Sequence, residues 1–242
     1  LGYSVFICNE AETEAVQALI SSAVKDHRAD GVILLSNEYN ATWLQEYARH
    51  MPIVQCCEYA ESVALPHIAI DNYRAAYEAV EYLINLGHRQ IATISSKLRY
   101  EGYCDALRAA GLEPAADYVV KASPDYSYQS GYLLANKLFN LQARPSAVFC
   151  ISDILALSAV AAAADRGLSV PGDVSIMGFD DVGYTTMFHP YLSTIAQPCY
   201  EIGSKSMQTL HAFKASFPAV PEVEPMAYKL VLRESTAPCK AV

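Results

Sequence analysis

The chain has 242 residues, of which 52% are hydrophobic and 18% charged, enough apolar material for one large core or for two lobes. Its formal net charge is -9 and no cluster of Lys and Arg interrupts it, so these residues lack the cationic surface that supplies most non-specific affinity for DNA. No apolar run approaches the roughly 20 residues needed to span a bilayer, and the first residues do not resemble a signal peptide, which argues against a membrane partner.

Short β-branched runs alternate with amphipathic stretches along the chain, the pattern of an α/β protein with parallel sheets. Strands are predicted, in chain order, at residues 31–35, 53–56, 91–94, 118–122, 147–151 and 174–178. Helices are predicted near residues 14–27, 72–86, 98–110, 128–140 and 153–166. Most of the predicted strands are continuous apolar runs, as expected when helices cover both faces of a sheet.

Capping residues mark the ends of these helices. The predicted N-caps are Asp71, Ser127 and either Ser152 or Asp153, and the predicted C-terminal glycines are Gly87, Gly111 and Gly167. Nearer the C-terminus the rhythm changes to an extended stretch at 190–198, a helix at 200–217 and a strand at 228–233. This change of pattern near the C-terminus indicates that the chain crosses between two lobes.

Motifs for catalysis or for cofactor binding are missing from the sequence. It contains no dinucleotide-binding or phosphate-binding glycine loop, no metalloprotease His pair and no hydrolase elbow, so we predict neither an enzyme nor a cofactor. His88 follows a helix C-terminus, where a structural role is the simpler interpretation. The seven cysteines are scattered without a Cys-x-x-Cys pair, which favours thiols in a reducing cytoplasm; a reactive role for the vicinal pair Cys56-Cys57 is the less favoured alternative.

Polar and aromatic residues gather after the predicted strands, where open α/β sheets place their ligand sites. They are Cys57, Glu58, Tyr126, Ser152, Asp153, Asp180 and Asp181. Simple helix capping is the alternative for Ser152 and Asp153, and a turn carboxylate is the alternative for Asp180. Arg99 lies in the first turn of its helix, where the dipole disfavours a cation, so it needs either a ligand or a surface salt bridge.

Several segments, in this order along the chain, resemble the LacI family of repressors. They are 30–34, 70–72, 86–91, 99–103, 144–150, 167–181, 192–198 and 233–235. Any one segment is weak evidence for the resemblance, but the ordered set is specific to the family. Its strongest member is the run Val170-Pro171-Gly172-Asp173-Val174-Ser175-Ile176-Met177-Gly178-Phe179-Asp180.

The resemblance implies two Rossmann-like lobes of the type I periplasmic-binding-protein fold, joined by three crossovers, with the effector in the cleft between them. We place the N-terminal lobe at residues 1–70 and 198–224 and the C-terminal lobe at residues 71–197 and 225–242. By the same resemblance, the ligand-binding residues are Arg99, Asp180, Ser152, Asp153, Tyr126, Cys57, Glu58 and Phe179. Leu157 and Phe188 match positions between the C-terminal lobes of family homodimers, with buried core as the alternative.

The implied function is sensing of a small-molecule effector, a nucleoside, a pentose or another sugar, by a cytoplasmic transcription regulator. The run 194–203 points to the branch of the family that includes the cytidine and purine repressors. A periplasmic sugar-binding protein of a transport system and an enzyme on the same scaffold are the alternatives.

The chain departs from the family pattern in two places. It begins at what resembles the family's second strand, Tyr3 to Cys8, so we expect a helix-turn-helix domain, absent here, to contact operator DNA. The loop between Ser96 and Lys97 is shorter than the family's.

Overall fold

The computed structural model describes residues 2–8, 13–35, 41–60, 62–95, 97–123 and 126–240. Contacts between Cα atoms divide the chain into two compact units. The smaller unit comprises Leu1–Ala69 and Cys199–Met226, and the larger unit comprises Ile70–Pro198 and Ala227–Val242.

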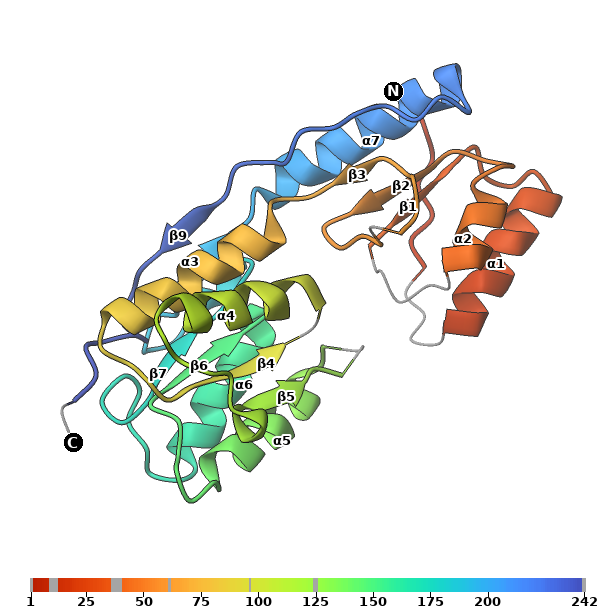
Figure 1. Cartoon of the computed structure of the whole chain (residues 1–242). Helices are drawn as coiled ribbons and strands as arrows, with labels where there is room; N and C mark the ends of the chain where they lie inside the picture. Colours follow the sequence, from red (N-terminus) through yellow and green to blue (C-terminus); the bar gives the residue numbers. More distant parts are fainter. Residues whose placement is uncertain are drawn as a thin grey trace. The chain divides into compact units, whose positions relative to one another are not determined.

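The larger unit is built on a parallel sheet with the strand order β5-β4-β6-β7. Its strands are β4 (Ile91–Ser95), β5 (Val119–Lys121), β6 (Ala147–Cys150) and β7 (Ser175–Met177). Two pairs of helices cover its two faces, α3 (Asn72–Asn85) with α4 (Lys97–Ala109), and α5 (Tyr128–Phe139) with α6 (Asp153–Ala164) (Figure 1). Every residue of β4, β6 and β7 is therefore buried, as their continuous apolar runs predict.

The smaller unit contains a second parallel sheet, with the strand order β1-β2-β3. Its strands are β1 (Val32–Leu34), β2 (Ile53–Cys56) and β3 (His67–Ile68). Helices α1 (Thr13–Lys25) and α2 (Ala41–Tyr47) pack on this sheet over an apolar core that includes Ile20, Leu34, Leu44 and Ile53 (Figure 1). A long helix, α7 (Cys199–Ser216), packs against all three strands. Two parallel sheets with helical cover confirm the predicted α/β class.

The remaining elements complete the larger unit. Strands β8 (Thr194–Ala196) and β9 (Lys229–Val231) pair antiparallel, and two short 3-10 helices are η1 (Ala116–Tyr118) and η2 (Gly183–Thr186). The buried His88 ring bonds through Nδ1 to the Ser146 hydroxyl (2.9 Å) and through Nε2 to the Ala237 carbonyl (3.1 Å), which ties the last segment to the sheet. Burial lowers the pKa of His88, so the ring has a structural role as a neutral group and not as the cation that the helix dipole would favour.

Most of the predicted caps are confirmed. The Asp71 carboxylate accepts from the Arg74 amide (2.8 Å) and the Ser127 hydroxyl from the Ser130 amide (3.1 Å). The three predicted C-terminal glycines have φ values of 91°, 71° and 69°, the left-handed conformation that favours glycine: Gly87, Gly111 and Gly167. Ser152 is the N-cap of α6 by position, although its side chain makes no capping bond.

The prediction of a strand from Tyr3 to Cys8 is wrong. Residues 2–8 have no regular secondary structure, and the side chains of Val5, Phe6 and Ile7 are 73%, 83% and 89% exposed. An apolar run becomes a strand only when a neighbour completes its hydrogen-bond ladder, and no described strand pairs with this segment. The short elements α2 and β3 were not predicted, because seven and two residues are too few for a periodic pattern. Ser96, in the shortened loop, lies outside the described residues.

Candidate functional site

The strands of the larger unit end in a group of buried polar side chains. Since β4, β6 and β7 are parallel neighbours, the residues that follow them lie along one edge of the sheet. Ser95 ends β4, Ser152 follows β6, and Phe179 and Asp180 follow β7. This edge, with the side chains that reach it from α3 and α4, is called the carboxyl edge of the larger unit below.

Arg99 is held at this edge by three different segments. Its Nε donates to the Asn72 side-chain oxygen (2.9 Å), its Nη1 donates to the Ile151 carbonyl, and its guanidinium lies 3.7 Å from the centre of the Phe179 ring. The residue is only 7% exposed, so the surface salt bridge considered as an alternative is wrong. Phe179 itself is fully buried, and its ring supports the guanidinium through a cation–π contact.

The turn after β7 has an unusual backbone. Asp180 and Asp181 have φ values of 115° and 56°, which side chains other than glycine rarely adopt. The backbone amide of Asp180 donates to the Ile195 carbonyl (2.8 Å), and the side-chain Nε2 of Gln197 donates to the Asp180 carboxylate (2.7 Å). An ion pair between Asp181 and Arg233 (2.7 Å) also holds the turn. Backbone strain that the surroundings hold in place is common at ligand sites.

Asp153 is a fully buried carboxylate next to this turn. Its two oxygens accept bonds from the Thr194 hydroxyl (2.6 Å) and the Val182 amide (2.9 Å), so it joins α6 to β8 and to the segment before η2. Burial raises its pKa to about 7, although both hydrogen bonds oppose this shift. The nearby charges of Asp180 and Asp181 raise the pKa further.

Five buried polar atoms in the larger unit have no hydrogen-bond partner among the described residues. They are the hydroxyls of Thr93, Ser95 and Ser152 and the side-chain oxygens of Asn136 and Gln197, and the two serines lie at the carboxyl edge. Buried polar groups are nearly always paired, so unpaired ones at a sheet edge indicate a bound water or ligand. Of the residues described here, the sequence singled out Ser152 and missed Ser95, Gln197 and Asn72 as site residues. The rule that selected Ser152, a polar residue directly after a buried strand, would also have found Ser95.

The other predicted residues of the larger unit lie outside the hydrogen bonds described above. Tyr126 is half-buried with a φ of 43°, directly before the N-cap of α5. Phe188 is 72% exposed and Leu157, on α6, is half-buried.

Cys57 and Glu58 follow β2 in the smaller unit. Cys57 has a φ of 65° and its amide donates to the Ile68 carbonyl (2.9 Å) of β3, while the Glu58 amide donates to the Cys56 carbonyl (2.8 Å). The predicted pair therefore forms a tight turn at the end of the strand.

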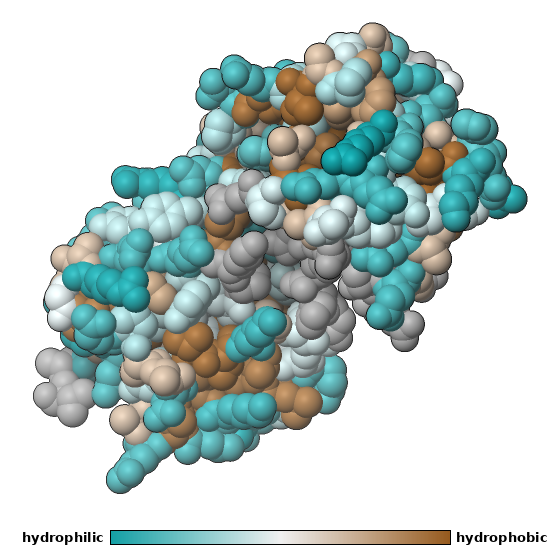
Figure 2. All heavy atoms as spheres, turned by 45° about the vertical axis from the view of Figure 1, so that its right-hand side comes forward, coloured by the Kyte–Doolittle hydropathy of each residue, from teal (hydrophilic) through white to brown (hydrophobic). Residues whose placement is uncertain are grey.

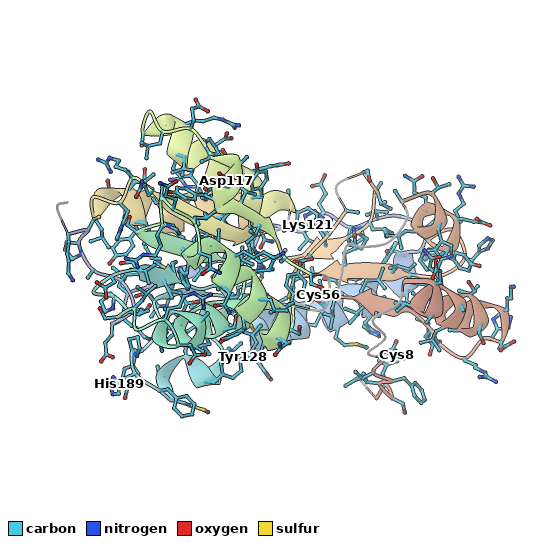
Figure 3. All side chains as sticks on the ribbon, turned by 90° about the horizontal axis from the view of Figure 1, so that it is seen from below. Cys8, Cys56, Asp117, Lys121, Tyr128 and His189 are labelled. Atoms are coloured by element: carbon cyan, nitrogen blue, oxygen red, sulfur yellow. The ribbon has the colours of Figure 1, made fainter. Side chains whose placement is uncertain are left out.

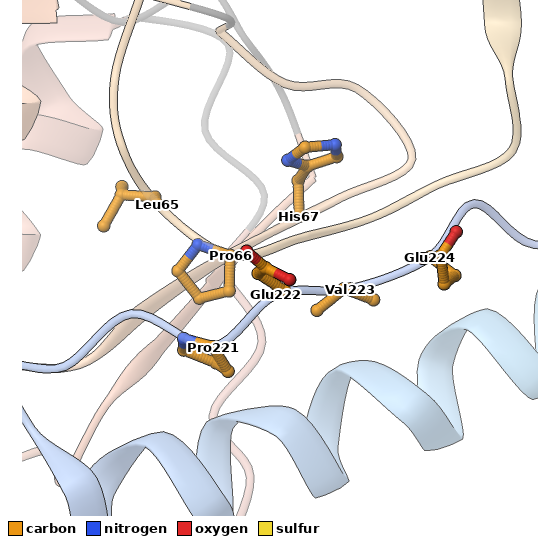
Figure 4. A pocket seen from close by; sticks show the side chains of 7 residues that line it. All are labelled: Leu65, Pro66, His67, Pro221, Glu222, Val223 and Glu224. Atoms are coloured by element: carbon orange, nitrogen blue, oxygen red, sulfur yellow. The ribbon is translucent and has the colours of Figure 1, made fainter.

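Two surface grooves contain none of the predicted ligand-binding residues. The larger, of about 600 Å³, lies in the smaller unit, where residues 65–67 run beside residues 221–224 (Figure 4). The second, of about 300 Å³, lies between α3 and α4. Hydrophilic side chains cover most of the face in Figure 2, and the hydrophobic ones gather into patches on each unit.

Among the described residues, no group of three or more His, Cys, Asp or Glu side chains could hold a metal ion. None of the helices in the described ranges is long and apolar enough to cross a bilayer.

Comparison with known proteins relates this architecture to a family. The family of periplasmic binding protein-like domains matches residues 80–236. The HTH-type transcriptional repressor CytR of Escherichia coli (strain K12) is 35% identical to the chain over an alignment that covers 86% of this chain and 63% of the repressor. The chain thus spans less than two thirds of the length of that relative.

Solved structures of regulators share the fold. The crystal structure of a protein described as a transcriptional regulator LacI, from Bacillus cereus subsp. cytotoxis NVH 391-98, superposes with a TM-score of 0.89 at 27% identity, over 98% of this chain and 86% of that one. The complex of the transcriptional regulator CelR with cellobiose superposes with a TM-score of 0.80 at 28% identity, over 90% of this chain and 69% of that one. The chain therefore belongs to the periplasmic binding protein-like domain family, in the form that makes up the core of LacI-family regulators.

Proposed function

We propose that the chain is the effector-binding core of a cytoplasmic LacI-type transcription regulator. A nucleoside, a pentose or another sugar binds to it, and binding controls a helix-turn-helix domain that contacts operator DNA. The relatives support this proposal, since one is a repressor by name and another is a regulator in complex with cellobiose. They favour a regulator over the transport protein that the sequence left as an alternative.

The observation that carries the proposal is the setting of Arg99 at the carboxyl edge of the larger unit. A guanidinium has five N–H donors in a planar fork, and the bonds to Asn72 and Ile151 use only two of them. With the Asp180 carboxylate in the adjoining turn, the edge offers donors and acceptors that suit vicinal hydroxyls. Phe179 and Asp153, which the resemblance assigned to ligand binding, are fully buried against Arg99 and Thr194, so we propose that they act as positioning residues together with Asn72.

Ser152 supplies a further hydroxyl in this proposal, and Tyr126 supplies a ring that stacks on the ligand. Cys57 and Glu58 are the ligand contacts that we propose from the smaller unit.

Isothermal titration of the chain with cytidine, adenosine, ribose, other pentoses and cellobiose tests the proposal. We expect one class of ligand to bind, and chromatography of the mixture after incubation to recover that ligand intact. Absence of heat with every compound would contradict a sensor of these effectors. Conversion of the ligand to product would favour the enzyme alternative.

Arg99→Ala should weaken binding of that ligand about 100-fold, because a charge-assisted hydrogen bond to a ligand contributes about 1.5–3 kcal/mol. Arg99→Lys should also bind weakly, since an ammonium does not reproduce the fork. Arg108→Ala is the matched control, because Arg108 lies on the same helix with its side chain 56% exposed and paired with Asp105. Circular dichroism should show that all three variants fold. Wild-type affinity in Arg99→Ala would remove the basis of the proposal.

The regulator is proposed to be a homodimer that uses Phe188 and Leu157. Phe188 exposes an aromatic ring beside Met187, which is 65% exposed, and apolar side chains of this size gain most from burial against a partner. Sedimentation velocity should show a dimer for the wild type and a monomer for Phe188→Asp. A wild-type monomer at every concentration would contradict this part of the proposal.

A further inference from the structure

Two adjacent thiols at the end of β2 lie in van der Waals contact with each other. The sulfur atoms of Cys56 and Cys57 are 3.7 Å apart, compared with about 2.05 Å in a disulfide, so both are thiols in this structure. Cys56 is only 4% exposed, whereas Cys57 is half-buried and gives the pair a side open to small molecules. The position of Cys56 in the chain can be followed in Figure 3, where the residue is labelled.

The surroundings of the pair favour its reactive form. The hydrogen bond from Cys57 and a weaker one from the Ser206 hydroxyl, on α7, lower the pKa of Cys56 to about 7 in spite of its burial. A thiol with that pKa is substantially ionised near neutral pH, and the thiolate is the nucleophilic form. The left-handed backbone of Cys57 and the bond from its amide to Ile68 hold the second sulfur beside the first.

We propose that Cys56 and Cys57 form a vicinal dithiol that a hydroperoxide oxidises reversibly to a disulfide.

The reaction takes place in two steps. The pair carries one proton, which Cys57 retains while the Cys56 thiolate attacks a peroxide oxygen. The S–O bond forms as the O–O bond breaks, and the released hydroxide takes a proton from solvent to become water. Cys57 then attacks the Cys56 sulfenic acid, so that the S–S bond forms, the S–O bond breaks and the hydroxide leaves as water with the Cys57 proton. Two thiols are oxidised by two electrons, and one hydrogen peroxide is reduced to two waters.

The product should be easy to reduce. Adjacent residues have Cα atoms about 3.8 Å apart, closer than the 4.4–6.8 Å range usual for disulfides, and strained disulfides are the labile ones. The oxidised form is therefore suited to a reversible modification rather than to a structural crosslink.

The modification would also alter the turn that contains Glu58. Closing the sulfur gap moves the Cys57 side chain and the amide of Glu58, which bonds to the Cys56 carbonyl. If Cys57 and Glu58 contact the effector, a step that rests on the function proposed above, oxidation should weaken effector binding about tenfold.

Mass spectrometry of the folded chain after treatment with hydrogen peroxide tests the proposal. The background is a chain with Cys8→Ser, Cys199→Ser and Cys239→Ser, because these cysteines are exposed or half-buried and could form disulfides between molecules. We expect the peptide that contains both Cys56 and Cys57 to lose about 2 Da, and dithiothreitol to restore its mass. Stable sulfinic acids without this loss, or no reaction at the pair, would overturn the proposal.

Cys56→Ser and Cys57→Ser provide the matched controls. The single thiol that remains in each should not lose 2 Da but should accumulate as a sulfenic acid that dimedone traps, about tenfold more than in the parent. Far-ultraviolet circular dichroism checks that both variants fold. Disulfide formation in either variant at unchanged yield would show that another cysteine is the partner.

Titration of the effector into the reduced and oxidised forms tests the coupling. Equal affinity in both forms would overturn the coupling, and absence of binding in the reduced form would contradict the proposed function. The mass change stands apart from both results, so failure of one proposal is distinguishable from failure of the other.

Discussion

The carboxyl ends of the two sheets hold their polar groups in different ways. In the larger unit, Arg99, Asp153 and Asp180 are each bonded to segments far apart in the sequence. In the smaller unit, the corresponding end of β2 is a tight turn in which the Cys57 amide bonds to Ile68 on β3 and the Glu58 amide bonds to Cys56. The bonds described for the first arrangement are made by side chains, and those described for the second are made by the backbone.

The two arrangements differ in how firmly the side chains are held in position. Side chains locked by buried partners are held within small tolerances, at the cost of desolvating charged groups such as Asp153. The stability of the larger unit should therefore respond sharply to substitutions at its buried, packed positions and to pH, whereas exposed positions of the smaller unit should respond weakly.

The largest effect should come from Gly102→Ala in the larger unit. A Cβ atom at this position would lie 2.3 Å from the Tyr73 carbonyl oxygen and 3.0 Å from the Tyr77 amide, so α4 could not pack as closely on α3. We expect the free energy of unfolding to fall by about 3 kcal/mol, as in severe overpacking. Urea denaturation measures this change. An unchanged midpoint would show that α3 and α4 move apart without loss of stability. It would contradict the expectation that the larger unit is the more sensitive of the two units to substitution.

A smaller effect should come from the ionisation of Asp153. Its pKa is about 7 in the folded chain and 3.8 in the reference state, so the folded state binds this proton more tightly. The resulting stabilisation is fully present below pH 3.8 and is lost as the pH rises through 7.

Asp153→Asn removes this titration. The difference in stability, wild type minus variant, should fall by about 2 kcal/mol between pH 5 and pH 8, from the linkage between pKa and stability. Lost hydrogen bonds to Thr194 and Val182 weaken the variant at both pH values and so cancel in that difference. Urea denaturation at the two pH values gives the result, with the exposed Asp117→Asn as the control (labelled in Figure 3). Equal differences at pH 5 and 8 would mean that Asp153 titrates normally.

The smallest effect, and one of opposite sign, should come from Gly203→Ala on α7 of the smaller unit. Among the described residues no atom lies within 4 Å of an added Cβ, and the position is exposed within a helix. Alanine should raise the free energy of unfolding by about 0.5–1 kcal/mol, because it loses less backbone entropy than glycine. Thermal denaturation checks the shift. A loss of stability as large as that expected at Gly102 would abolish the contrast between the two units.

Local signals in the sequence were sufficient for the elements of the larger unit. The continuous apolar runs before Ser95 and Ser152 predicted buried strands, and the caps at Asp71 and Ser127 placed two helix starts correctly, because capping depends on residues three apart or fewer. The strand expected at residues 3–8 came from the family resemblance, and it does not form because no described strand pairs with this segment.

By itself, the sequence determined the α/β class, the order of most elements and a family resemblance that the comparisons confirm. Only the tertiary structure decided which partners hold each side chain: that Arg99 is buried over Phe179, that Asp153 bonds to Thr194, and that the sulfurs of Cys56 and Cys57 lie side by side. The physical reason is the separation along the sequence over which each kind of interaction acts. Periodicity and capping act over a few residues, whereas burial and hydrogen bonding at a site join segments tens of residues apart, and one sequence read alone does not record which of them meet.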